Sequence, residues 1–273
     1  MSEVKQRWRL VFARDEEARY LSHLDAVRLW ERAFRRGEIP VATSEGFTPR
    51  SRLIFAAPLQ LGMLAEHELA DLFLAERLTA PDLRDRLAAG MPRGYRVVDL
   101  HDVWVGAPAI APQLAAADYR MTLLNVERTA LESAAATLTA AERLPRERLK
   151  EGKSIPYDLR PLLLDIRAIP PDPKAAPPEA AAAMTSVWMR LRHTQDRGSG
   201  RAEEVVAALA DEMGLVASPA SGGVGGEAEA DETRAEIVAP AARAVIEVIR
   251  PVRERLWLVN ELDSEASSGG VVG

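Results

Sequence analysis

The sequence of 273 residues contains no cysteine. This absence excludes disulfide bonds, cysteine-ligated zinc, iron–sulfur clusters and thiol catalysis within the chain. It is also typical of a cytoplasmic protein, which is the location that we expect. Aromatic residues are scarce at 5%, so we expect the hydrophobic cores to consist mainly of Leu, Val, Ile and Ala.

Long apolar runs are lacking as well. The first residues do not form the apolar stretch of a signal peptide, and no segment approaches the ~20 apolar residues of a transmembrane helix. The glycine patterns that hold nucleotide phosphates are absent, and the four histidines show no metal-ligand spacing. We therefore expect no membrane, metal or cofactor.

An excess of basic charge is the third absence. The formal net charge is -6 and the pI is about 5.5, so bulk charge does not predict nucleic-acid binding, which depends on phosphate neutralisation. Any basic surface has to be local. The remaining composition, 47% hydrophobic and 28% charged, is that of a globular protein, and the length suits two domains.

Hydrophobic periodicity in residues 1–106 predicts a ferredoxin-like domain with the order βαββαβ. Ser22 and Asp25 resemble a capping box that opens a helix, and Gly37 is a natural stop for it. The expected elements are a strand at 8–12, a helix at 22–36, a second strand at 40–43, a third strand at 53–57 that residues 68–74 extend or continue after Gly62, a helix at 79–90 and a last strand at 95–105.

The same order recurs in residues 118–262, after an Ala/Pro-rich linker at 107–117. We therefore predict an α+β fold of two ferredoxin-like halves in tandem. A Pro/Ala-rich insert at 170–183 and a Gly/Ala/Glu-rich insert at 218–233 interrupt the second half. Both inserts, and a disordered tail at 263–273, contain too few apolar residues to offset the entropy of ordering.

Four sequence blocks in the first half resemble the bacterial radical-SAM-linked protein family. They read YLSHLD at residues 20–25, ERAFRR at 31–36, SEGFTPR at 44–50 and APLQLG at 57–62. Two later blocks, KEGK at 150–153 and DLRPL at 158–162, are similar to its second-half motif. The resemblance covers about the first 110 residues well and the remainder in patches.

That family is a domain of unknown function, found beside or fused to a cobalamin-binding radical SAM protein. The resemblance therefore implies such a protein as a partner. A radical SAM enzyme needs a three-cysteine cluster site, so this chain is not itself that enzyme. The interpretation that follows is a non-catalytic recognition module that binds RNA or another anionic substrate.

Two other functions stay open. Paired ferredoxin-like folds with a histidine near the first helix are similar to CRISPR repeat-processing endoribonucleases, in which case His23 is the catalytic acid or base. The chain is alternatively a scaffold that binds only protein. His23 can also be a capping or core-edge residue.

The first group of candidate ligand-binding residues surrounds the first predicted helix. Arg28, Arg32 and Arg35 share one helix face, where guanidinium groups can bind phosphates bidentately. The alternative is a solvated face opposite the apolar one. The candidates in the preceding turn, which also belong to the motif region, are Arg19, Tyr20, Ser22 and His23.

The second group lies in the loop at residues 44–50. Its glycine brings backbone N–H groups near an anion, and Phe47 is placed to stack on a base. Ser44, Glu45 and Arg50 complete this group, although a purely structural loop with a buried Phe47 is the alternative. Lys153 and Arg160 add a basic cluster in the second half, again with a solvated surface as the alternative.

Overall fold

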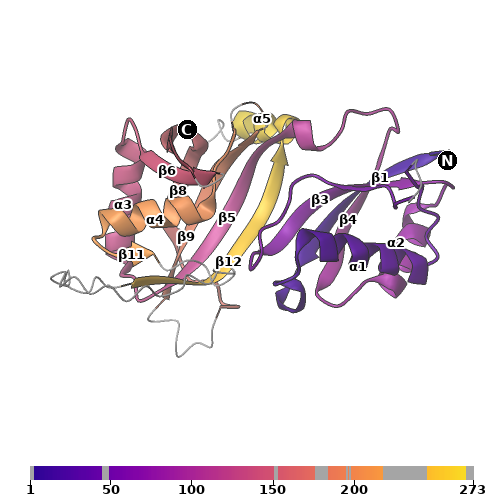
Figure 1. The fold of residues 1–273 in the computed structure, drawn as a ribbon, viewed down its shortest axis with the longest axis horizontal. Coiled ribbons are helices and arrows are strands. Elements are labelled where there is room, and N and C mark those ends of the chain that lie inside the picture. The colour runs from indigo at the N-terminus through magenta and orange to yellow at the C-terminus, as the bar shows by residue number, and fades with distance from the viewer. Residues whose placement is uncertain are drawn as a thin grey trace. The chain divides into compact units, whose positions relative to one another are not determined.

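A computed structural model describes residues 3–44, 49–150, 153–175, 184–194, 196, 198–217 and 245–268 (Figure 1). The chain forms two compact units. The first unit contains Met1–Tyr119, Arg190–Ser199 and Pro251–Gly273, and the second contains Arg120–Met189 and Gly200–Arg250. Each unit is therefore built from segments that are distant in the sequence.

The elements of the first half follow the order expected from the sequence. They are β1 (Gln6–Arg14), η1 (Glu16–Ala18), α1 (His23–Arg36), β2 (Leu53–Phe55), β3 (Leu64–Leu74), α2 (Ala80–Gly90) and β4 (Tyr95–Val103).

The later elements contribute to both units. They are η2 (Ala111–Gln113), β5 (Leu114–Leu124), α3 (Arg128–Ala140), β6 (Pro145–Lys150), β7 (Lys153–Asp158), η3 (Arg160–Leu162), β8 (Leu163–Ile169), β9 (Met184–Thr194), β10 (Gly198–Ser199), α4 (Ala202–Glu212), β11 (Val216–Ala217), β12 (Val245–Leu258) and α5 (Val259–Ser268).

A large mixed sheet organises the described part of the chain. Its strand order is β10-β9-β5-β12-β3-β1-β4, while β2 pairs with β3, β8 with β9 and β11 with β12. In the first unit β1 lies antiparallel between β3 and β4. β12 pairs parallel to the start of β3, with Val252 opposite Leu64. A C-terminal strand thus completes the sheet of the N-terminal segment.

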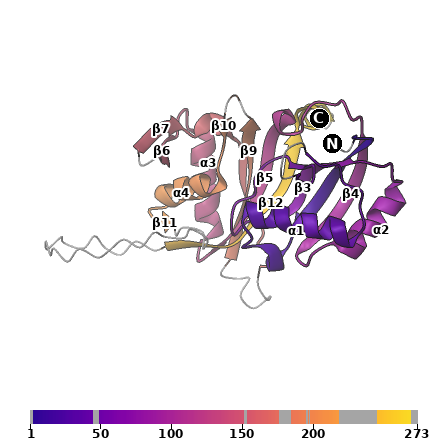
Figure 2. The same ribbon diagram turned by 45° about the vertical axis from the view of Figure 1, so that its right-hand side comes forward.

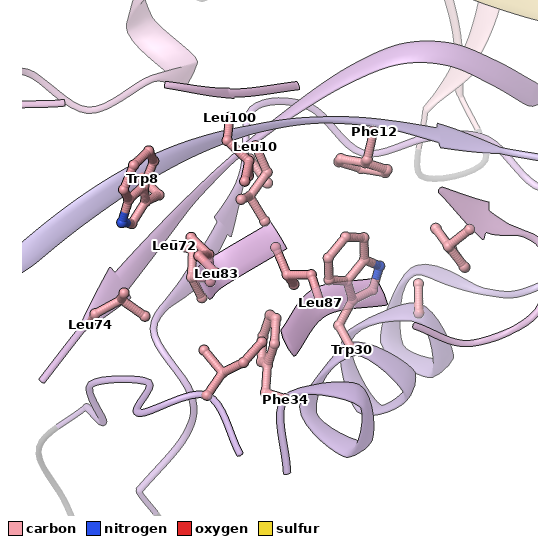
Figure 3. Packing of buried hydrophobic residues seen from close by; sticks show 14 of the residues in the cluster. Trp8, Leu10, Phe12, Trp30, Phe34, Leu72, Leu74, Leu83, Leu87 and Leu100 are labelled. Atoms are coloured by element: carbon pink, nitrogen blue, oxygen red, sulfur yellow. The ribbon is translucent and has the colours of Figure 1, made fainter. Parts of the chain in front are cut away.

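The core of the first unit lies between this sheet and two helices, α1 and α2, which cover the same face of β1, β3 and β4 (Figures 1 and 2). Alternate residues of β1, including Leu10 and Phe12, contact this core. Trp30 and Phe34 of α1 lie opposite them (Figure 3). The Trp30 ring is fully buried and lies edge-on to Phe12 with 5.1 Å between ring centroids.

The two helices approach each other closely at a pair of glycines. A methyl group added at Gly90 would lie 2.2 Å from the Ala33 carbonyl oxygen, and one added at Gly37 would lie 2.3 Å from that of Arg86. Arg36 donates a hydrogen bond to the Gly90 carbonyl at 2.7 Å. The glycine that ends α1 therefore also makes room for α2.

The second unit packs α3 and α4 with parts of the same sheet. Leu131 and Leu138 of α3 and Leu209 of α4 are fully buried. The side chains of Thr122 and Ser186 are hydrogen-bonded to each other at 2.9 Å within the sheet. β6 and β7 form a separate two-stranded hairpin, with Pro145 opposite Asp158 (Figure 2).

The predicted combination of helices and strands is confirmed in its coarse form, as helices packed with a large mixed sheet, and α1 and α2 lie close to their expected bounds. Residues 40–43 form only isolated bridges, at Val41 and Thr43, instead of a strand. In the second half, residues 157–166 do not form one continuous strand, because Pro161 has no N–H for a ladder and lies in η3 between β7 and β8.

Two segments differ from the composition-based expectation. The linker expected at 107–117 contains η2 and the start of β5, and its Ile110 and Leu114 are buried. The tail expected from residue 263 overlaps α5. This helix is held to β9 by an ion pair between Arg190 and Glu265 at 2.5 Å. A few well-placed contacts therefore order segments whose average composition is that of a linker or tail.

The predicted inserts lie mostly outside the described residues. The insert at 218–233 lies outside entirely, and of the insert at 170–183 the structure describes 170–175. There Asp172 is buried and accepts a hydrogen bond from Arg250 at 3.0 Å. Among the described helices, none combines the length and the apolar character required to span a bilayer.

Candidate functional site

Two of the motif blocks meet at one corner of the first unit, although about 40 residues separate them in the sequence. Arg19 Nε donates to the Gly62 carbonyl at 2.7 Å, and the Gly62 N–H donates to the Arg19 carbonyl at 3.0 Å. We call residues 19–23 together with residues 57–63 the motif corner. It brings the start of α1 against the loop that precedes β3.

Arg14 is buried behind the motif corner and holds it together. Its guanidinium donates to the carbonyls of Gln60 at 2.6 Å and Met63 at 2.5 Å, and more weakly to that of Leu21 at 3.4 Å. Burial lowers the pKa of Arg14, and burial also raises the pKa of the neighbouring Tyr95 phenol. Arg14 therefore shapes the corner through backbone carbonyls, and it also lines the small pocket beside it.

A buried ion pair lies beside Arg14. Arg253 of β12 donates from Nε to Glu68 Oε1 at 2.6 Å, and its Nη2 also contacts this carboxylate. Burial alone would lower the pKa of Arg253, but Glu68 keeps that pKa above its ordinary value. Arg253 Nη1 further donates to the Pro58 carbonyl at 3.2 Å. The C-terminal strand therefore helps to hold the motif corner.

A small pocket opens between these groups. Its walls include Phe12, Phe55, Tyr95 and Glu68, with His23 at the side formed by α1. Its volume is about 20 Å³, which suffices for about one water molecule and not for a base or a phosphate. The exposed His23 ring lies edge-on to Phe55 with 5.6 Å between ring centroids. The imidazole is thus positioned at the surface beside a pocket for a very small group.

Ser22 caps α1 and is engaged within the chain. Its Oγ accepts a hydrogen bond from the Asp25 N–H at 3.1 Å and donates to the Asp25 carboxylate at 2.7 Å. A carboxylate of the protein therefore already occupies the positive end of the helix dipole. Tyr20 is more than half exposed, and the Arg19 guanidinium lies 5.3 Å from its ring centroid.

Arg28, Arg32 and Arg35 occupy exposed positions on one face of α1, beginning one turn after His23. Arg28 forms an exposed ion pair with Asp25 at 3.6 Å. Such surface pairs contribute little stability, so they do not prevent an arginine from binding a ligand. We call these three residues the arginine row.

The loop at residues 44–50 is described only at its ends. Ser44 Oγ accepts from the Arg50 N–H at 3.1 Å, and the Ser44 N–H donates to the Arg50 carbonyl at 2.9 Å. Arg50 is exposed. Glu45 and Phe47 lie outside the described residues, so their predicted roles remain predictions.

The two candidates of the second half belong to the second unit. Lys153 is exposed at the start of β7. Arg160 donates to the carbonyls of Thr139 and Ala141, both at 3.1 Å, and to that of Leu163 at 2.8 Å. These carbonyls include the C-terminal end of α3, so the contacts of Arg160 are those of a helix-capping residue.

Sequence reasoning missed the buried charges behind the motif corner. A usable pattern was present. Arg14 lies on the same face of β1 as the core residues Leu10 and Phe12, and Glu68 lies on the same face of β3 as the core residue Ala70. A charged residue at a core-facing position of a strand needs a buried partner. That rule would have identified Arg14 and Glu68, although not the distant Arg253.

Within the described ranges no three His, Asp or Glu side chains gather in a way that would hold a metal ion.

Comparison with known proteins identifies a family and no activity. No curated protein matches the chain. A family described as "Uncharacterized protein conserved in bacteria" (DUF2344) matches residues 7–201. Because the match covers most of the sequence, the chain belongs to this bacterial family.

Proposed function

We propose that the protein is a non-catalytic recognition module that binds RNA, or another anionic substrate, for a separate cobalamin-binding radical SAM protein. The observation that supports this proposal best is the exposed arginine row, which continues from the motif corner along α1. Exposed guanidinium groups at helical spacing match the repeated charges of a phosphate backbone. Tyr20 adds an exposed ring on which a base can stack.

We also infer that the sheet derives from two ferredoxin-like halves. Supporting this inference, β4-β1-β3 with β2 on β3 has the same relative order as β12-β5-β9 with β8 on β9. Ferredoxin-like sheets often bind single-stranded RNA, but fold alone is weak support for function. The argument for RNA therefore depends on the arginine row.

The proposed partner follows from the motif resemblance and from chemistry. A chain without cysteine cannot supply a three-cysteine cluster, so a separate polypeptide would carry out the reaction. The test is co-purification with the cobalamin-binding radical SAM protein that the resemblance implies as its neighbour. Failure of the two purified proteins to associate at micromolar concentration would remove this part of the proposal.

RNA binding is tested by measuring affinity for a structured and a single-stranded RNA over a series of salt concentrations. The variant Arg28→Gln/Arg32→Gln/Arg35→Gln should reduce the slope of log K against log salt by about 2 for single-stranded RNA, since each phosphate contact contributes about 0.7. Arg77→Gln/Arg93→Gln/Arg96→Gln is the matched control, because these arginines are also exposed in the first unit. Equal slopes for the two variants would refute the role of the arginine row.

The endoribonuclease alternative rests on one observation, the exposed imidazole of His23 beside the pocket. It predicts that His23→Ala abolishes cleavage of a structured RNA and leaves RNA affinity unchanged. A wild-type protein that cleaves no structured RNA would eliminate it. The scaffold alternative predicts no RNA affinity at any salt concentration. The titration above therefore separates the scaffold from the two RNA-binding functions, and the cleavage assay separates those two from each other.

A further inference from the structure

A second site lies on the other face of the sheet in the first unit. Alternation along β1 places Val11 opposite to Leu10 and Phe12, whose side chains enter the core beneath the helices. Val11 and Leu69, its partner in β3, line a groove of about 240 Å³ together with Leu256 of β12. We call this the sheet-face groove. Its volume far exceeds that of the pocket beside His23, and its floor is aliphatic.

One side of the groove presents a donor and an acceptor next to each other. Arg255 Nη2 lies 3.5 Å from Glu261 Oε2, and both residues line the groove. The Arg255 guanidinium stacks on Trp257 at 3.9 Å from the ring centroid. The Leu258 N–H donates to the Glu261 carboxylate at 3.3 Å. Both polar groups are therefore held in place before any ligand arrives, which lowers the entropic cost of binding.

The remaining polar lining consists of His67, Asp99 and His101. His67 Nδ1 lies 3.1 Å from the Glu254 carbonyl, and this carbonyl can only accept a hydrogen bond. In the neutral ring the Nε2 of His67 is therefore an acceptor. Asp99 lies 3.4 Å from the His101 ring. The lining of the groove contains two carboxylates, Asp99 and Glu261, against one guanidinium, and the carboxylates repel a phosphate group.

We propose that the sheet-face groove binds a single nucleobase, with guanine preferred. Guanine offers acceptors at O6 and N7 for Arg255, and its N1–H and N2–H donors suit the Glu261 carboxylate. Its planar faces suit the aliphatic floor formed by Val11 and Leu69. This inference deepens the proposed function and rests on it, because a base-reading groove would add sequence preference to the phosphate contacts of the arginine row.

The test is calorimetric titration of the full chain with guanosine, adenosine and ribose 5-phosphate. We expect saturable binding of guanosine, at least tenfold tighter than that of adenosine, and no binding of ribose 5-phosphate. Arg255→Gln and Glu261→Gln should each weaken guanosine binding about tenfold or more. Because Arg255 stacks on Trp257, guanosine should also change the tryptophan fluorescence, and Arg255→Gln should remove that change.

The matched control is the exposed pair of Arg128 and Glu132 in α3 of the second unit, whose side chains lie 2.8 Å apart. Arg128→Gln and Glu132→Gln should leave guanosine binding unchanged. The inference is overturned by a lack of guanosine binding, by unchanged binding in Arg255→Gln, or by competition from ribose 5-phosphate. If RNA binds through the arginine row while guanosine does not bind, only this inference fails. If guanosine binds and RNA does not, only the proposed function fails.

Discussion

Loss of either partner of the ion pair between Glu68 and Arg253 should destabilise the first unit strongly. Both side chains are less than 5% exposed, and the pair joins β3 to β12. Removal of one partner leaves the other charge buried and uncompensated, which costs about 3–5 kcal/mol. Because a domain of this size has a free energy of unfolding of about 5–15 kcal/mol, either single substitution should destabilise it severely.

The structure therefore predicts a large coupling energy in a double-mutant cycle. Glu68→Leu and Arg253→Met should each lower the free energy of unfolding by about 3–5 kcal/mol, whereas the double variant should lose less than their sum and come near the wild type. Urea unfolding followed by tryptophan fluorescence and circular dichroism measures these values. The exposed pair of Arg128 and Glu132 is the control, with an expected coupling of about 0.3–0.5 kcal/mol. A cost below about 1 kcal/mol for Arg253→Met, or strict additivity, would refute the reasoning.

Two further predictions concern pH and helix packing. Burial, with repulsion from Arg253, lowers the pKa of His193 to about 4, so between pH 6.5 and 4 the unfolded chain binds a proton that the folded chain does not. The free energy of unfolding should therefore fall as the pH falls through this window, by at most about 3 kcal/mol. His193→Gln should flatten this pH dependence in denaturant titrations, and an unchanged slope would contradict it. Gly90→Ala should lower the free energy of unfolding by about 1–3 kcal/mol, because its methyl group would meet the Ala33 carbonyl at 2.2 Å. Thermal unfolding measures this loss, and Ala89→Ser at the exposed neighbouring position is the control. Equal unfolding midpoints for Gly90→Ala and Ala89→Ser would show that α1 and α2 can move apart without a cost in stability.

Local patterns allowed the two helices of the first half, α1 and α2, to be predicted close to their observed bounds. The helix α1 follows from the Ser22 cap, the apolar face containing Trp30 and the Gly37 stop, all within 16 residues. The exposed arginine row follows from the same periodicity. Predictions of this kind succeed because neighbouring residues in the sequence determine the outcome.

The contacts behind the motif corner were not predictable in the same way. No local pattern connects Arg253 with Glu68, which it contacts across 185 positions in the sequence. The parallel pairing of β12 with β3 is likewise non-local. The Ala/Pro-rich segment at 107–117 is ordered because single residues such as Ile110 are buried, which its average composition does not indicate. The sheet-face groove depends on this pairing, since Arg255 and Leu256 come from β12.

The parallel pairing of β12 with β3 also has a consequence for synthesis. During translation β1 and β3 leave the ribosome long before β12 does. The ion pair between Glu68 and Arg253 can form only after the 185 positions that separate them have been synthesised. Until then the nascent protein carries an unsatisfied sheet edge along the first residues of β3, the kind of surface that recruits chaperones or pairs wrongly with other chains. The first unit can therefore be completed only after β12 has been synthesised.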